Sequence, residues 1–172
     1  YDTERDASLV ERLRRIMLRT VWAITEQMKL GKFDTVDSEV SFRMDKEKQT
    51  YIGRVDRIDT METEENIYVK IVDYKTGKKD LSLSDLYYGL QLQLMVYLRA
   101  AVDKQTRRSK KMVIPAGVLY YHIEDPFVTS RLDFEEKRTY LLNELLMRGL
   151  VNEEDPVLPS LDATLTGEEG TL

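Results

Sequence analysis

The sequence has 172 residues, of which 42% are hydrophobic and 33% charged, a composition that suits one globular domain with its own core. The absence of cysteine excludes disulfides, zinc–thiolate sites and iron–sulfur ligands within this chain. The formal net charge of −5 excludes nucleic-acid binding by bulk positive charge alone, so any contact with phosphate must be local, metal-mediated or assisted by a partner.

The sequence carries no sign of a membrane segment. No apolar run reaches the length of a membrane span or of the apolar core of a signal peptide. We therefore expect a cytoplasmic protein with no membrane partner. Because residue 1 is Tyr and not Met, we also expect the chain to be a piece of a longer polypeptide.

The hydrophobic pattern changes its period along the first half of the chain. Residues 4–30 place apolar side chains, including Leu13, Met17 and Ile24, at intervals of three and four, which predicts an amphipathic helix ending at Gly31. Residues 37–45, 49–59 and 67–75 are typical of strands and are separated by polar turns. We expect these strands to form an antiparallel meander.

The second half predicts a helix over 83–103, a central strand over 112–123 and a last helix over 134–150. The order of elements is that of an α/β (α+β) fold with a central mixed sheet. We expect residues 1–150 to form one domain and residues 151–172 to be an acidic, flexible tail.

The most informative motif is Asp73-Tyr74-Lys75, at the end of an apolar strand. Successive side chains of a strand alternate, so Asp73 and Lys75 point the same way and Tyr74 the other. A metal site would explain this pair, because a carboxylate binds a divalent cation and a lysine positions the attacking water. The alternative is an ordinary strand end, since Glu135-Glu136-Lys137 has the same pattern on a predicted helix.

A second carboxylate stands in Gly53-Arg54-Val55-Asp56, on the preceding strand. A regular strand places Asp56 on the same face as Arg54 and Asp59 on the opposite face. The separation of 17 positions between Asp56 and Asp73 allows one turn and a neighbouring strand, so the two carboxylates can converge. Like charges that converge need a cation or a proton between them. The alternative is that Asp56 pairs with Arg54 or Arg57 at the surface.

Gln93 and Tyr97 lie four residues apart and so share one helix face. An amide and a phenol on that face can contact a nucleic-acid backbone or the site, or they can simply pack between helix and sheet. The basic turn 107–111 can guide a nucleic acid or be a solvated loop. His122, the only histidine, is interpreted as a strand residue and not as a catalytic base.

Three short motifs follow one another along the predicted fold: Gly53-Arg54-Val55-Asp56, Asp73-Tyr74-Lys75-Thr76-Gly77 and Gln91-Leu92-Gln93-Leu94-Met95-Val96-Tyr97. In this order they resemble the nuclease domain of the PD-(D/E)XK superfamily, in its RecB-like branch. Together with the residues that flank them, the motifs are similar in sequence to the B subunit of bacterial AddAB-type helicase-nucleases. The resemblance covers residues 37–126.

The resemblance implies a restriction-endonuclease-like core and a metal-dependent deoxyribonuclease. Asp56 and Asp73 would bind Mg²⁺ or Mn²⁺ with the backbone carbonyl of Tyr74, and Lys75 would orient the attacking water. The implied partners are DNA, single-stranded, and a helicase-nuclease partner subunit, with ATP needed only in the complex. The implied role is double-strand break processing and recombinational repair.

The resemblance also implies supporting groups. Gln93 and Tyr97 match the family's Gln-x-x-x-Tyr motif, which supports the site and the DNA, and Glu39 resembles a recurring strand position. Family members add a His or Glu from an early helix, which is not assignable here. Relatives of the B subunit often hold an iron–sulfur cluster, which this chain cannot hold without cysteine.

Three hypotheses follow. The first is a Mg²⁺-dependent nuclease domain, favoured by the intact set of Asp56, Asp73 and Lys75. The second is a catalytically inactive module of the same fold that binds DNA or a partner subunit. The third is an unrelated α+β interaction domain, which predicts that these three residues lie apart in space.

Overall fold

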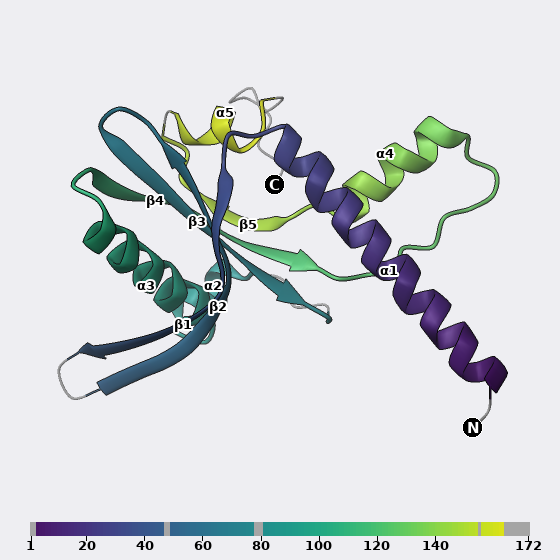
Figure 1. The fold of residues 1–172 in the computed structure, drawn as a ribbon, viewed down its shortest axis with the longest axis horizontal. Helices are drawn as coiled ribbons and strands as arrows, with labels where there is room; N and C mark the ends of the chain where they lie inside the picture. Colours follow the sequence, from purple (N-terminus) through teal and green to yellow (C-terminus); the bar gives the residue numbers. More distant parts are fainter. Residues whose placement is uncertain (1–2, 47–48, 78–80, 155, 164–172) are drawn as a thin grey trace.

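A five-stranded mixed sheet forms the centre of the computed structural model, which describes residues 3–46, 49–77, 81–154 and 156–163 (Figure 1). The strands lie in the order β1-β2-β3-β4-β5. They are β1 (Asp34–Lys46), β2 (Gln49–Glu62), β3 (Asn66–Lys75), β4 (Met112–His122) and β5 (Arg148–Val151). β1, β2 and β3 form an antiparallel meander, β4 runs parallel to β3, and β5 runs antiparallel to β4. The predicted fold class is confirmed.

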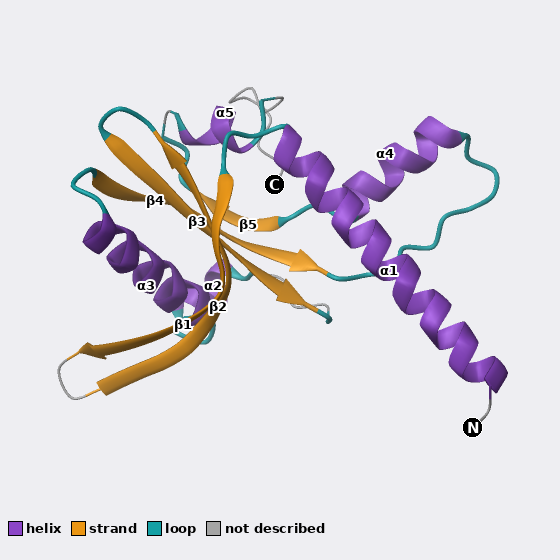
Figure 2. Cartoon of the chain, in the orientation of Figure 1, coloured by secondary structure: helices purple, strands orange, loops and turns teal. Residues whose placement is uncertain are grey.

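Helices cover both faces of the sheet (Figures 1 and 2). They are α1 (Thr3–Lys29), α2 (Leu83–Tyr87), α3 (Gln93–Arg108), α4 (Phe134–Glu144) and α5 (Val157–Leu161). α3 packs on one face, whereas α5 and the C-terminal part of α1 contact the other. Within the described ranges, no helix combines the length and apolar character that crossing a membrane requires.

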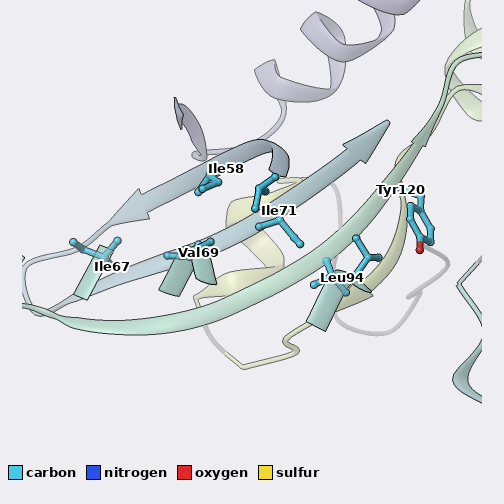
Figure 3. Packing of buried hydrophobic residues seen from close by; sticks show 9 residues of the cluster. Ile58, Ile67, Val69, Ile71, Leu94 and Tyr120 are labelled. Atoms are coloured by element: carbon cyan, nitrogen blue, oxygen red, sulfur yellow. The ribbon is translucent and has the colours of Figure 1, made fainter. Parts of the chain in front are cut away.

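β3 is buried on both faces, which explains why its sequence is a continuous apolar run. Ile67, Val69 and Ile71 point toward α3 and pack with Leu94 (Figure 3). The other face of the strand packs into separate clusters, and Val72 is fully buried there. The residues that follow Val72 therefore extend from a buried strand that is held in the core.

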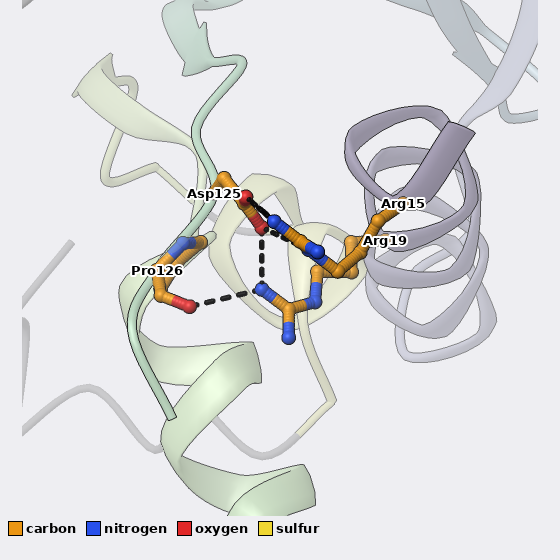
Figure 4. A network of polar contacts seen from close by, with 4 residues as sticks. All are labelled: Arg15, Arg19, Asp125 and Pro126. Carbon is orange, nitrogen blue, oxygen red and sulfur yellow. Dashed lines mark hydrogen bonds and ion pairs between the residues drawn. The ribbon is translucent and has the colours of Figure 1, made fainter. Parts of the chain in front are cut away.

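The middle of α1 is tied to the loop after β4 through Asp125 (Figure 4). Arg15 Nε lies 3.0 Å from Asp125 Oδ1, and Arg19 Nη1 donates to the same oxygen at 2.7 Å and to the Pro126 carbonyl at 2.9 Å. The hydrogen bonds from Arg15 hold the pKa of Asp125 below its ordinary value. These contacts fix the direction in which α1 crosses the molecule.

The predicted helix over 134–150 is wrong in its second half. α4 ends at Glu144, and residues 148–151 form β5 on the edge of β4. Gly149 permits this pairing, because a Cβ there would lie 2.0 Å from the carbonyl oxygen of Val118. The domain boundary predicted at residue 150 thus falls inside β5.

The chain beyond β5 continues to pack against the domain up to Leu161, since Val157 is fully buried. Residues 164–172 lie outside the described residues, so the expected flexibility stays a prediction for them.

Two further expectations differ from the structure. The helix predicted over 83–103 is split into α2 and α3, because Gly89 adopts a φ of +74°, which ends a helix. The apolar stripe of α1 packs only toward its C-terminal end, at Ile24. Leu13 and Met17 are 51% and 67% exposed, and the N-terminal part of α1 extends away from the sheet (Figure 1).

Candidate active site

Asp73 and Lys75 leave the end of β3 side by side, as the alternation of the strand predicts. Lys75 Nζ lies 2.6 Å from Asp73 Oδ2, and Asp73 is only 3% exposed. Burial opposes the charge on Lys75, but the hydrogen bond and the charge of Asp73 outweigh it and raise the pKa of Lys75. The lysine is therefore a fixed cation at neutral pH.

Asp56 lies next to this pair, at the point where the backbone pairing of β2 with β3 ends. The last paired residues are Arg57 and Val72. The Tyr74 N–H, which lies beyond the last pair, donates to Asp56 Oδ2 at 2.9 Å. The charge of Asp56 also raises the pKa of Lys75, although less than Asp73 and Tyr120 do. The backbone of β3 thus holds the second carboxylate beside the first.

The alternative that Asp56 pairs with a neighbouring arginine is wrong. Arg54 Nε instead bonds Glu39 Oε2 at 2.8 Å, on the exposed surface of the β1–β2 hairpin. Arg57 turns to Asp59 and donates to both of its oxygens at 2.7 Å. Both arginines are thus engaged elsewhere, and Asp56 remains available to the site.

The donors at the site are hard oxygen atoms. Asp56 and Asp73 supply carboxylates, which suit Mg²⁺ or Mn²⁺ and not a soft metal. Within the part of the chain that the structure describes, no group of three His, Cys, Asp or Glu side chains is placed to hold a metal ion. A bound ion would need further oxygen atoms from the backbone, from water or from a bound substrate, and the Tyr74 carbonyl stays a predicted ligand.

Gln93 and Tyr97 meet each other at the start of α3. Gln93 Nε2 donates to the Tyr97 hydroxyl at 2.7 Å, and the Tyr97 ring lies edge-on to Phe42 of β1 at 5.6 Å. Gly53 leaves room for both rings, since a Cβ there would lie 2.8 Å from the Phe42 ring. The pair therefore packs α3 on the hairpin, and its role toward DNA stays a prediction.

Sequence reasoning missed Tyr120 of β4. The parallel register of β3 and β4 pairs Asp73 with Tyr120 and Lys75 with His122. Lys75 Nζ lies 5.5 Å from the centroid of the Tyr120 ring. No local motif marks this residue, because the pairing depends on how the chain returns to the sheet after α3.

A profile of the PD-(D/E)XK nuclease superfamily matches residues 2–165. The chain belongs to this superfamily. The fold and the convergence of Asp56, Asp73 and Lys75 agree with that assignment. The hypothesis of an unrelated interaction domain, which predicts that the three residues lie apart, is wrong.

Several curated relatives of this nuclease domain are named as the B subunit of an ATP-dependent helicase/deoxyribonuclease. The protein from Lachnoclostridium phytofermentans is 40% identical over 99% of this chain, and that from Ruminiclostridium cellulolyticum is 37% identical over 96%. The protein from Clostridium novyi is 37% identical over 91%. The resemblance to the B subunit is therefore confirmed. The chain spans only 15% to 16% of the length of these relatives.

Proposed function

We propose that this chain is a deoxyribonuclease domain that hydrolyses phosphodiester bonds with the help of Mg²⁺ or Mn²⁺. The observation that carries the proposal is the ion pair of Lys75 with Asp73 at 2.6 Å. The Asp56 carboxylate lies next to it and accepts a hydrogen bond from the Tyr74 N–H. A buried acid, a second acid and a fixed cation at one strand end cost folding free energy, and hydrolytic chemistry is a reason for that cost.

Each residue has a distinct role in this proposal. Asp56 and Asp73 would hold the metal ion together with the Tyr74 carbonyl. When bound, such an ion would supply a lower pKa for a bound water and positive charge beside the phosphate. Lys75 orients the attacking water and adds a positive charge where negative charge develops. Gln93 and Tyr97 contact the DNA backbone beside the site.

The relatives' names support a wider context. We propose that the chain is the nuclease domain of a cytoplasmic helicase-nuclease with a partner subunit, acting in double-strand break processing and recombinational repair. Its substrate is single-stranded DNA that the helicase produces, and ATP is needed only in that complex. The acidic net charge of −5 agrees with delivery of the DNA by a partner.

A second candidate is an inactive module of the same fold that binds DNA or a partner subunit. It is favoured by the absence, among the described residues, of a third acidic or histidine ligand beside Asp56 and Asp73. In this case the metal would bind weakly and the DNA would remain intact.

One experiment separates the two candidates. The chain is incubated with end-labelled single-stranded DNA in Mg²⁺, and cleavage is compared with that of Asp73→Ala and Lys75→Ala. The nuclease proposal expects cleavage that EDTA abolishes and that each substitution lowers on the order of a hundredfold. Asp103→Ala, which removes a carboxylate of α3 that pairs with the exposed Arg99, is the control and should retain activity. DNA binding without cleavage by the wild type would favour the inactive module.

A further inference from the structure

Among the described residues, the ammonium group of Lys75 makes an ion pair and a contact with an aromatic ring. The ion pair is with Asp73 Oδ2 at 2.6 Å, and the ring is that of Tyr120, whose centroid lies 5.5 Å away. A cation at this distance from the face of an aromatic ring is attracted by the ring's electrons, most strongly where water is excluded. Tyr120 is only 2% exposed, so the ring is buried, whereas the Lys75 side chain is 25% exposed.

The Tyr120 ring is itself held firmly. It lies at one end of the core cluster that includes Ile71 and Leu94 (Figure 3). The His122 ring packs against it nearly edge-on, with centroids 6.4 Å apart. A ring braced in this way cannot follow a mobile lysine, and so it determines where the lysine rests.

These two neighbours of Lys75 differ in what else they can bind. A carboxylate that also binds a divalent cation has less negative charge to offer an ammonium group. The ring of Tyr120 contacts Lys75 without using a carboxylate oxygen. Burial raises the pKa of the Tyr120 phenol, and the charge of Lys75 partly counters this effect.

We propose that Tyr120 is a positioning residue of the nuclease site, whose ring holds the Lys75 ammonium beside Asp73. The inference rests on the proposed nuclease function. The aromatic ring, and not the hydroxyl, holds the ammonium group in place. Phenylalanine at this position therefore preserves the contact with Lys75, and an aliphatic side chain does not.

The first test is the cleavage of single-stranded DNA in Mg²⁺ by Tyr120→Phe, Tyr120→Leu and Tyr120→Met. Tyr120→Phe should keep kcat within about threefold, whereas the two aliphatic variants should lose about tenfold in kcat with little change in KM. Tyr68→Leu is the control, because Tyr68 is a buried tyrosine of β3 on the opposite face. It should lose stability but keep kcat.

The second test needs neither metal nor DNA. With lysine labelled at Cε, the NMR signal that disappears in Lys75→Arg is assigned to Lys75. The Tyr120 ring should shift that signal upfield in the wild type and in Tyr120→Phe, and the shift should vanish in the aliphatic variants. The Phe variant retains the ring, so this readout survives even if an aliphatic variant does not fold.

Three results would overturn the inference. They are an unshifted Lys75 signal in the wild type, wild-type kcat in the aliphatic variants, and a loss in Tyr120→Phe as large as that in Tyr120→Leu. A wild type that does not cleave DNA would instead refute the proposed function, and the catalytic part of the inference with it. Failure of the inference alone is recognised by an active wild type.

Discussion

At the scale of single residues, the charges buried on the face away from α3 show what holds β2 and β3 in place. Asp59 is fully buried, receives two hydrogen bonds from Arg57 and lies 3.6 Å from Lys70 Nζ. Burial lowers the pKa of Lys70, although the charge of Asp59 opposes that effect, and the ring of Phe33 covers the ammonium at 4.9 Å. One carboxylate thus balances two buried cations next to the strand segment that carries Asp73.

Substitution of Asp59 by Asn would leave both cations without a counter-charge in a dry environment. We expect Asp59→Asn to lower the free energy of unfolding by about 3–5 kcal/mol, measured by urea denaturation at neutral pH. Asp103→Asn, which breaks only the surface pair with Arg99, should change it by no more than about 0.5 kcal/mol. A loss below about 1 kcal/mol in Asp59→Asn would contradict this role of the buried cluster.

At the scale of elements, Gly53 explains how α3 approaches the β1–β2 hairpin. A Cβ at this position would lie 2.8 Å from the Phe42 ring and 3.0 Å from the Tyr97 ring. Because the glycine of the Gly53-Arg54-Val55-Asp56 motif has no side chain, the Tyr97 ring can pack directly against the backbone of β2. This packing sets the position of Gln93, which is hydrogen-bonded to Tyr97.

Gly53→Ala should overpack this contact and lower the free energy of unfolding by about 1–3 kcal/mol. In a Phe42→Ala background the same substitution should cost less, because the nearest clashing ring is gone, and a double-mutant cycle in urea measures the difference. Gly77→Ala is the matched control, since a Cβ at Gly77 would meet nothing within 4 Å. Additive losses in the cycle would show that Phe42 is not the neighbour that matters.

The elements also show where sequence reasoning succeeds. Side chains of a strand alternate, so the prediction of a strand over residues 67–75 was enough to place Asp73 and Lys75 on one face. The spacing predicted that Asp56 lies beside the end of this strand, where it accepts a hydrogen bond from the Tyr74 N–H. Short elements were not predictable. β5 has four residues, and its identity depends on Gly149 fitting against Val118 across the sheet, which no local pattern reveals.

At the scale of the whole molecule, the proposed site draws on three strands. β2 supplies Asp56, β3 supplies Asp73 and Lys75, and β4 supplies Tyr120. The β2–β3 contribution could be predicted, because a meander brings sequence neighbours together. The β4 contribution could not, because the parallel register is set only after the chain has crossed the sheet through α3. The sheet is thus the scaffold that turns separate motifs into one site.

The proposed chemistry requires Asp56 and Asp73 to act together on a metal ion. Calorimetric titration of the chain with Mn²⁺, and then Mg²⁺, measures this without DNA or a partner subunit. We predict one bound ion in the wild type and in Asp103→Ala, and binding weaker by about tenfold or more in both Asp56→Ala and Asp73→Ala. Absence of binding in the wild type, or unchanged binding in these two variants, would contradict the shared metal site.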